Sequence, residues 1–346
     1  MNTASTLIEW YLRHKRDLPW RHTSDPYAIW LSEVILQQTR VDQGLAYYFR
    51  FLEKFPTVDH LAAASEDEVL KLWQGLGYYS RARNLRATAM IVSEVHIGKF
   101  PSTYEKLITL KGIGPYTAAA IASFAFGEKR AVVDGNVIRV LGRLFGIAEP
   151  YDTASGKKCY QLLADELIPE HDPGRFNQSI MEFGAICCTP RQPKCAECPF
   201  SQSCVARLSN KVSEFPVKSR KTAVQEVWYY YVVPDYREQT YVRRRSHNGI
   251  WKGLHDFPCV ESNAPLTPAE VRKAFAEQLQ LLIAAPALKR PVEMQHILSH
   301  RKIHAVFYRV SEKIMWKNMP EEYHQISWED LRELGVPRLI DRYLMG

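Results

Sequence analysis

The chain has 346 residues, enough for two or three domains that each bury a core of their own. Hydrophobic residues make up 46% of it and charged residues 24%, which excludes a disordered or fibrous protein. The net charge of +7 favours polyanionic partners without establishing one. The first residues lack the apolar core and cleavage site of an export signal, and no apolar run is long enough to span a membrane. We therefore expect a cytoplasmic protein without a membrane partner.

Residues 1 to about 205 show the periodicity of helices separated by short turns. The longest helical stretches are expected at 25–55 and 65–95, and Ser65 with Glu68 predicts a capping box at the start of the second. The first stretch contains Glu33, a carboxylate among apolar neighbours. A single Glu in such a stretch is usually a surface residue, so its position alone indicates no function.

Residues 104–126 predict two helices joined by a turn that contains Gly112 and Gly114. The first helix is expected to end at Leu110 and the second to begin at Pro115. Glycines let a ligand approach the backbone, and the free N–H groups at a helix N-terminus attract an anion. This is the pattern of a helix-hairpin-helix, although simple capping would give the same turn. Twenty residues after the second glycine, Asp134 precedes another expected helix.

Four cysteines lie within 17 residues, with the spacing C-x6-C-x2-C-x5-C: Cys188, Cys195, Cys198 and Cys204. The surrounding sequence is rich in Pro and poor in apolar residues, so an inorganic centre explains its order better than a hydrophobic core does. Four thiolates suit zinc or an iron–sulfur cluster, and the spacing leaves both possible. We expect the other three cysteines to be structural.

Residues 209–224 form a basic segment without clear periodicity and predict a linker. Beyond the linker the composition favours β-strands, as in the segments EVWYYYVV and KIHAVFYRV. Two helices are expected to interrupt them, starting at Thr267 and Ser327. The expected architecture is an all-α domain at 1–208 with a metal-binding loop at 188–204, then the linker, then a smaller α+β domain at 225–346.

Taken together, the glycine hairpin, the Asp134 segment and the four cysteines resemble the helix-hairpin-helix DNA glycosylases of the endonuclease III superfamily. Three further motifs resemble one branch of it, the adenine DNA glycosylases of MutY type: LPWR at 18–21, SEVILQQTRV from Ser32 and QGLGYYSRARNL from Gln74. The resemblance covers nearly the whole chain, strongly to about residue 205 and more loosely after 225. It implies base-excision repair of adenine mispaired with 8-oxoguanine or guanine in double-stranded DNA.

The same resemblance implies a [4Fe–4S] cluster on the four cysteines and a Nudix-like C-terminal domain that reads 8-oxoguanine. The helix from Thr267 lacks the clustered Glu residues that hold Mg²⁺ in Nudix hydrolases, so we expect recognition without hydrolysis. We also expect a monomer that is associated with the nucleoid if the source is bacterial.

Excision of adenine breaks an N-glycosidic bond and requires both an acid and an anion. The resemblance places the acid at Glu33, which would protonate adenine N7, and the anion at Asp134, which would stabilise the charged sugar. An apolar setting raises the pKa of a Glu toward the value that an acid needs near neutral pH, whereas Asp134 is expected to stay ionised. Tyr116 and Asn136 are expected to support these two carboxyl groups by hydrogen bonds.

Glycosylases that also cut the DNA backbone carry a Lys near the position after Pro115, where it forms a Schiff base with the sugar. That position is Tyr116 here, so we expect a monofunctional enzyme. The alternatives are a bifunctional glycosylase/lyase similar to endonuclease III and an iron–sulfur DNA-binding protein without catalysis. An electron-transfer protein would need neither the glycine hairpin nor Glu33.

The resemblance also assigns residues to the DNA and to the extruded base. Residues matching the adenine pocket are Trp20, Arg21 and Gln178. Residues matching contacts near the lesion, with the Tyr intercalated, are Gln38, Thr39, Leu76 and Tyr78. Three arginines fit phosphate contacts, namely Arg81, Arg83 and Arg86. In the C-terminal domain, the pair matching an 8-oxoguanine contact is Ser299 and His300, while Leu298 stands where the family usually has Phe.

Overall fold

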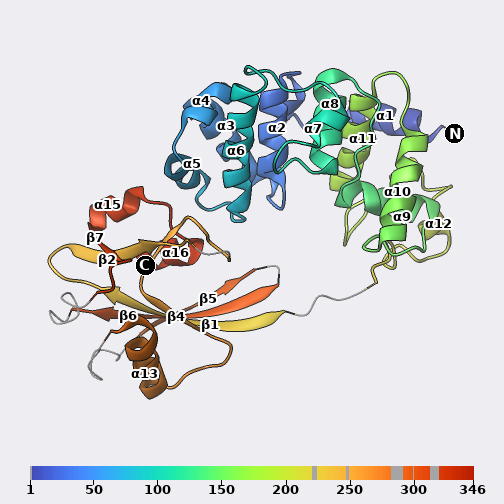
Figure 1. Ribbon diagram of the computed structural model, residues 1–346. Helices are drawn as coiled ribbons and strands as arrows, with labels where there is room; N and C mark the ends of the chain where they lie inside the picture. The colour runs from blue at the N-terminus through green and yellow to red at the C-terminus, as the bar shows by residue number, and fades with distance from the viewer. Residues whose placement is uncertain (1, 220–223, 247–248, 282–290, 299, 312–318) are drawn as a thin grey trace. The chain divides into compact units, whose positions relative to one another are not determined.

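The computed structural model describes residues 2–219, 224–246, 249–281, 291–298, 300–311 and 319–346. They form two compact units, which we call the helical unit (1–63 with 84–221) and the C-terminal unit (64–83 with 222–346). The expected fold class is confirmed, because the first is helical and the second combines sheets with helices (Figure 1). The domain boundaries predicted from the sequence, at 208 and 224, remain a prediction. They did not include the assignment of residues 64–83 to the C-terminal unit.

Five of the described helices of the helical unit begin with a polar side-chain cap. Asn2, Asp25 and Thr153 each accept a hydrogen bond from a backbone N–H group of the first turn that follows. The elements are α1 (Thr3–His14), η1 (Pro19–Arg21), α2 (Pro26–Leu36), α3 (Val41–Lys54), α4 (Val58–Ala63), α7 (Tyr104–Leu107), α8 (Pro115–Phe126), α9 (Gly135–Phe145), α10 (Ala154–Leu167), α11 (Pro173–Ile186) and α12 (Val205–Leu208). The helix α6 (Ser80–Glu94) begins in the C-terminal unit and continues into the helical unit.

Turns divide both of the long helical stretches that the sequence predicts. Gln38, with φ +58°, separates α2 from α3, and two glycines of positive φ, Gly75 and Gly77, follow α5 (Glu66–Trp73). The capping box of Ser65 and Glu68 is present at the start of α5. The expected end of α7 at Leu110 is wrong: the helix ends at Leu107, and the chain continues in tight turns closed by hydrogen bonds between residues three apart.

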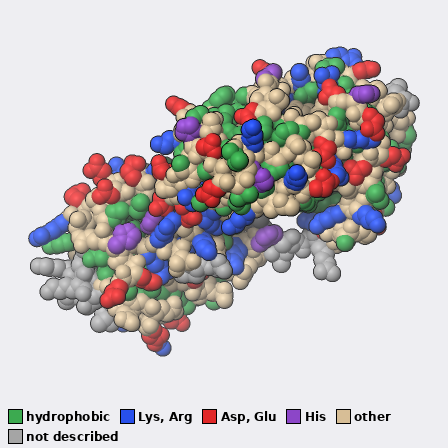
Figure 2. Space-filling view, turned by 45° about the horizontal axis from the view of Figure 1, so that its top comes forward, with side chains coloured by type: hydrophobic (Ala, Val, Ile, Leu, Met, Phe, Trp, Pro, Cys, Tyr) green, Lys and Arg blue, Asp and Glu red, His purple; other side chains and the backbone are tan. Residues whose placement is uncertain are grey.

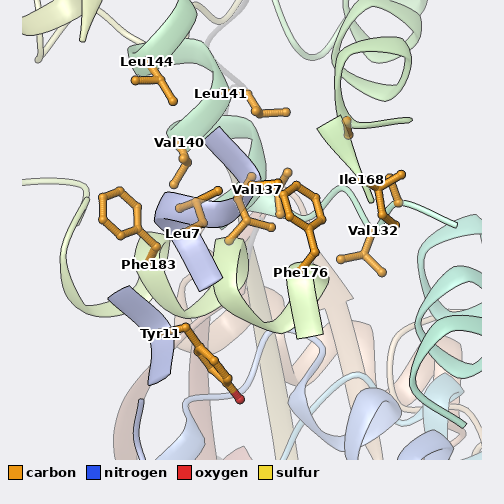
Figure 3. Close-up of a cluster of buried hydrophobic side chains, with 14 of the residues drawn as sticks. Leu7, Tyr11, Val132, Val137, Val140, Leu141, Leu144, Ile168, Phe176 and Phe183 are labelled. Atoms are coloured by element: carbon orange, nitrogen blue, oxygen red, sulfur yellow. The ribbon is translucent and has the colours of Figure 1, made fainter. Parts of the chain in front are cut away.

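The core of the helical unit centres on α9, whose apolar residues recur at helical spacing. Val137, Val140, Leu141 and Leu144 are all buried, at positions i, i+3, i+4 and i+7. They pack against side chains of α1, α10 and α11, as Figure 3 shows for Leu7, Phe176 and Phe183. The helix is therefore fixed along its length, with its N-cap Asp134 at one end and Gly146 in the left-handed conformation at the other.

The glycine turn between α7 and α8 depends on Gly112 rather than on Gly114. Gly112 has φ +77°, and a Cβ atom there would lie 2.6 Å from the Cβ of Asn84 on α6. Gly114 has φ −89° and ψ 178°, which any residue can adopt, and precedes Pro115 at the first position of α8. The left-handed conformation and the close approach to the Asn84 side chain thus require a glycine at position 112.

The C-terminal unit contains two sheets. A four-stranded sheet has the order β4-β1-β6-β5, in which β1 and β6 are parallel and the other pairs antiparallel, and a three-stranded sheet has the order β3-β2-β7. The elements are β1 (Gln225–Pro234), β2 (Gln239–Arg244), β3 (His255–Asp256), β4 (Cys259–Ser262), α13 (Pro268–Leu279), β5 (Val292–Ile297), β6 (Arg301–Val310), β7 (His324–Ser327), α15 (Trp328–Glu333) and α16 (Arg338–Met345).

Alternate residues of β1 face opposite sides of the larger sheet. Tyr230 packs in a cluster with Val271 and Phe275 of α13 on one side. On the other side Tyr231 stacks on Phe307 of β6 at 4.7 Å between ring centroids. Both faces of this sheet are therefore buried, which explains the unbroken apolar run in β1.

The segment 64–83 is bound to the C-terminal helices by polar contacts. The side chain of Gln74 donates a hydrogen bond of 2.8 Å to Asp341 of α16, and the Tyr79 hydroxyl donates one of 3.3 Å to the carbonyl of Val336. Arg244 at the end of β2 forms an ion pair of 2.9 Å with Glu66. These contacts join residues far apart in sequence and have no signature in the local pattern.

In the part of the chain that the structure describes, no helix combines the length and apolar composition needed to cross a membrane.

Replacing Gly112 by Ala should destabilise the protein, because a side chain there combines a left-handed backbone conformation with a contact of 2.6 Å. The first effect alone costs about 1–2 kcal/mol. Thermal unfolding of G112A and of the matched control G114A measures the difference, since a Cβ at Gly114 would meet nothing within 4 Å. Equal midpoints for the two variants would contradict this account of the turn.

Candidate active site

A cavity of about 710 Å³ lies in the helical unit. Its wall comes from η1 and the segment before it, the end of α2, the start of α8, the start of α9 and one side of α11. The sequence-predicted residues that it brings together are Trp20, Arg21, Glu33, Gln38, Thr39, Tyr116, Asp134, Asn136 and Gln178. Cavities of this size hold small organic molecules, so there is room for a nucleobase with part of its sugar.

Glu33 is buried, with only 7% of its surface exposed. The helix α2 that carries it is apolar on all sides, and its neighbours Trp30 and Val34 are buried as well. Burial disfavours the charged form and raises the pKa of Glu33 to about 7, helped by the nearby charge of Asp134 and opposed by a hydrogen bond from Tyr116 and by the charge of Arg21. Glu33 is therefore a buried carboxyl group and not the surface residue that its position in the sequence alone would indicate.

Tyr116 stands in the first turn of α8, directly after Pro115. Its hydroxyl donates a hydrogen bond of 2.8 Å to Oε2 of Glu33 and lies 3.9 Å from Sδ of Met181. Burial raises the pKa of this hydroxyl well above its usual range, with the charges of Glu33 and Asp134 adding to the effect. Tyr116 thus remains a neutral donor that fixes the orientation of the Glu33 carboxyl group.

Asp134 is the N-cap of α9, and both of its oxygens accept hydrogen bonds. Oδ1 accepts from the backbone N–H groups of Asn136, at 2.9 Å, and Val137, at 2.8 Å, and Oδ2 accepts from the side chain of Asn136 at 2.7 Å. Burial raises the pKa of Asp134, while these hydrogen bonds and the charge of Arg139 lower it, with a net upward direction. The sequence indicated the hydrogen bonds but not this upward shift.

Arg139, on the next turn of α9, was not identified from the sequence. Its guanidinium donates to Oδ1 of Asn136 at 2.8 Å, and to the carbonyls of Gly184 and Cys188, each at 2.7 Å. The amide that holds Asp134 is thereby tied to the first residue of the cysteine segment. Only the fold brings these groups together, because 49 residues separate the arginine from the cysteine.

A second group of charged side chains forms another part of the cavity wall. Glu182 on α11 accepts hydrogen bonds from Arg16 and Arg21, and Tyr11 of α1 donates one of 3.1 Å to Gln178. The sequence pointed to Arg21 and Gln178 but missed Arg16 and Glu182. A carboxylate four residues after Gln178 on a helix was the available signal, since such residues share one face.

The four cysteines line a single small cavity together with Cys187, Pro193, Lys194 and two arginines, Arg143 and Arg207. No three His, Cys, Asp or Glu side chains in the described ranges are arranged to share one metal ion. Four thiols around one cavity can hold either a zinc ion or an iron–sulfur cluster, so the choice that the spacing left open is not decided by the cavity.

Arg143 on α9 is almost completely buried beside these cysteines. Its guanidinium donates hydrogen bonds to the carbonyls of Thr189, Pro190, Val212 and Phe215 and lies 3.5 Å from Sγ of Cys188. Arg143 therefore holds four carbonyls of the loop backbone together and places a positive charge next to the sulfur of Cys188. No local sequence pattern marks Arg143 as a functional residue.

Other predicted contacts fall outside the cavity. In the C-terminal unit Leu76 is buried, whereas Tyr78 is 50% exposed and has φ +48°. The phosphate contact expected for Arg81 is wrong, because its guanidinium is buried and donates to the carbonyls of Leu76 and Gly77. His300 is exposed beside the start of β6, and Ser299 lies outside the described residues.

Comparison with known protein families agrees with this arrangement. Residues 31–164 match the HhH-GPD superfamily of base excision DNA repair proteins, 188–204 match the iron–sulfur binding domain of endonuclease III, and 229–346 match the NUDIX domain. A thermostable thymine-DNA glycosylase superposes with a TM-score of 0.56 at 33% identity, over 60% of this chain and 95% of that one. An endonuclease III–DNA complex superposes with a TM-score of 0.51 at 23% identity, over 61% and 99%, and supports the fold.

The fold and the family matches thus define a base-excision repair glycosylase with a [4Fe–4S] cluster, whose binding segment is 188–204. An adenine DNA glycosylase of Buchnera aphidicola is 31% identical over 99% of this chain and 97% of its own length. The chain belongs to the adenine DNA glycosylase family, whose members are enzymes that act on N-glycosidic bonds of DNA.

Replacing Arg143 by Lys should weaken cluster binding, because an ammonium group cannot donate to four separated carbonyls at once. Loss of hydrogen bonds from a buried cation should cost at least about 2 kcal/mol of stability. The measurement is iron per chain, together with the thermal midpoint.

The matched control is Arg191→Lys, at an exposed position in the same loop. Iron content equal to that of the unmodified protein in both variants would show that Arg143 does not hold the loop.

Proposed function

We propose that the protein hydrolyses the N-glycosidic bond of adenine paired with 8-oxoguanine or guanine in duplex DNA, and that it does not cut the DNA backbone. The observation that carries the proposal is Glu33, a buried carboxyl group whose pKa is raised to about 7 inside a cavity large enough for a base. A group with this pKa holds a proton in a substantial fraction of molecules near neutral pH and can also give it up.

In the proposed reaction the adenine leaves the helix and enters the cavity, and Glu33 delivers a proton to N7. The proton makes the base a better leaving group, since the electrons of the breaking bond then neutralise a positive ring. Tyr116 keeps the carboxyl group oriented through its 2.8 Å hydrogen bond. Trp20 and Gln178 line the same cavity and are placed to contact the base.

Breaking the bond leaves positive charge on the sugar, and Asp134 supplies the compensating charge. Its oxygens are held by Asn136 and by the N-terminus of α9, so the carboxylate does not have to reorient as the charge develops. Water then attacks the sugar and completes the hydrolysis. The cluster has no part in these steps, and its four cysteines order the loop 188–204 that Arg139 ties to Asn136.

The absence of a lyase step is supported by the composition of the cavity wall. No Lys occurs among the described residues that line it, so the wall provides no amine to form a Schiff base with the sugar. The position after Pro115 is Tyr116, whose hydroxyl is already engaged with Glu33. A bifunctional enzyme similar to endonuclease III is therefore the less well supported alternative.

We assign duplex DNA as the partner of a monomeric enzyme, and the opposite base to the C-terminal domain. On the face seen in Figure 2, Lys and Arg side chains are interspersed with Asp and Glu side chains, so particular contacts rather than a uniform basic surface should orient the DNA. In the C-terminal domain the N–H of Leu298 donates a 2.7 Å hydrogen bond to the carbonyl of Arg301, and His300 is exposed to solvent.

We propose that the Nudix-like domain recognises the base opposite adenine and does not hydrolyse a pyrophosphate. The two Glu residues of α13 already have structural partners: Glu270 completes the capping box with Thr267, and Glu277 pairs with Lys273 at 3.7 Å. A pyrophosphohydrolase needs several free carboxylates to hold its metal ion.

The excision rate should fall as the pH rises through about 7, because Glu33 loses the proton that it must deliver. Above that value the protonated fraction falls about tenfold for each pH unit. Single-turnover excision from a duplex with one A opposite 8-oxoguanine, measured between pH 5.5 and 9 in steps of about half a unit, gives the profile. A rate that stays constant across this range would exclude Glu33 as the acid.

Replacing Glu33 by Gln should lower the excision rate by about 100-fold to 10,000-fold while leaving DNA binding intact, since the amide keeps the shape but delivers no proton. Strand breakage after heating in alkali reports excision, and a gel-shift assay reports binding. Retained turnover by E33Q would refute the assignment. Breakage of the DNA by the unmodified enzyme without alkali would overturn the monofunctional proposal.

A further inference from the structure

Glu182 is the least exposed carboxylate of the cavity wall, and its two oxygens are saturated with donors. Its side chain has no exposed surface. Oε1 accepts from the backbone N–H of Arg16 at 2.9 Å and from Nε of the same residue at 2.8 Å, while Oε2 accepts from Nη2 of Arg16 and of Arg21, each at 2.7 Å. Burial alone would raise the pKa of Glu182, but the hydrogen bonds from the two arginines outweigh it and lower the pKa to about 2.

The Arg21 guanidinium is held on several sides at once. Besides Glu182, it contacts the carbonyl of Arg16 at 2.9 Å and lies over the ring of Tyr11 at 5.5 Å. Tyr11 in turn donates to Gln178, so the arginine and the amide share a support. Only 11% of the Arg21 side chain is exposed, and this cation therefore requires a counter-charge from the protein.

The same cavity contains two other carboxyl groups that the reaction needs. The titratable and charged groups that face Glu33 are Tyr116 on α8, Asp134 at the start of α9 and Arg21 on η1. The positive charge of Arg21 favours the ionised form of Glu33, in opposition to burial and to Asp134. Without Glu182, the positive charge of Arg21 would act on Glu33 uncompensated.

We propose that Glu182 is a positioning residue, which holds Arg21 in the cavity wall and neutralises its charge so that Glu33 keeps the proton it delivers. The inference rests on the proposed function, because it concerns the acid of that reaction. A purely structural role would connect α11 to the segment before η1 and would affect folding but not the titration of Glu33. The two roles therefore differ in an observable way.

The test is the pH profile of single-turnover excision for Glu182→Gln. Loss of the Glu182 charge leaves Arg21 uncompensated, which favours ionised Glu33, so the alkaline limb should move to lower pH by about one unit. Glu182→Asp keeps the charge and should keep the limb in place even if the rate is lower. The matched control is Glu128→Gln, because Glu128 pairs with Arg130 at 2.9 Å and does not line the cavity.

A second variant keeps the inference testable if E182Q does not fold. Arg21→Gln removes the cation itself and should move the alkaline limb to higher pH. In the double variant R21Q/E182Q the limb should also lie above that of E182Q.

If the alkaline limb of E182Q coincides with that of the unmodified enzyme, the positioning role is overturned. If E182Q does not fold, an unmoved alkaline limb in R21Q overturns it instead. An unmodified enzyme that excises adenine without any alkaline limb, or does not excise it, would overturn the proposed function and this inference with it. A normal limb in the unmodified enzyme with unmoved limbs in the variants would overturn this inference alone.

Discussion

Besides the exposed Asp42, three carboxyl groups line one cavity, and a carboxyl group removed from water must either hold a proton or be given donors. Each of the three meets this constraint differently. Glu33 has one hydrogen bond, from Tyr116, and its pKa rises. Asp134 is held by the first turn of α9, and Glu182 by two guanidinium groups. In the proposed reaction the proton comes from Glu33, the group with the fewest donors, whose pKa is raised to about 7.

The rest of the helical unit keeps the surroundings of the three carboxyl groups different. Helix α2 provides an apolar environment for Glu33, and the core around α9 fixes the position of Asp134. The cysteine loop reaches the same place through Arg139, which joins Asn136 to the carbonyl of Cys188. An inorganic cluster is a suitable support here, because the loop around it has too few apolar residues to order itself.

The sequence was most informative where function depends on local patterns. The four cysteines, the turn at Gly112 and the cap at Asp134 are read over short distances, and the structure contains each of them. It was least informative where function depends on partners that folding brings together. Arg143 was missed because its four carbonyl partners lie 46 to 72 residues away, and Arg81 was misread because the sequence does not show that its charge is buried.

The N-cap position of Asp134 has a consequence for genetics. The same carboxylate starts α9 and faces the cavity, so an alanine there would remove a helix cap, worth about 1 kcal/mol, as well as a charge. Asparagine is as good a cap as aspartate and removes the charge alone. Two substitutions at one codon would therefore give different phenotypes with temperature: the alanine allele should be thermolabile, whereas the asparagine allele should be equally defective at every growth temperature. Comparing how much protein each allele accumulates as temperature rises would check this hypothesis, and matching losses of both would sink it.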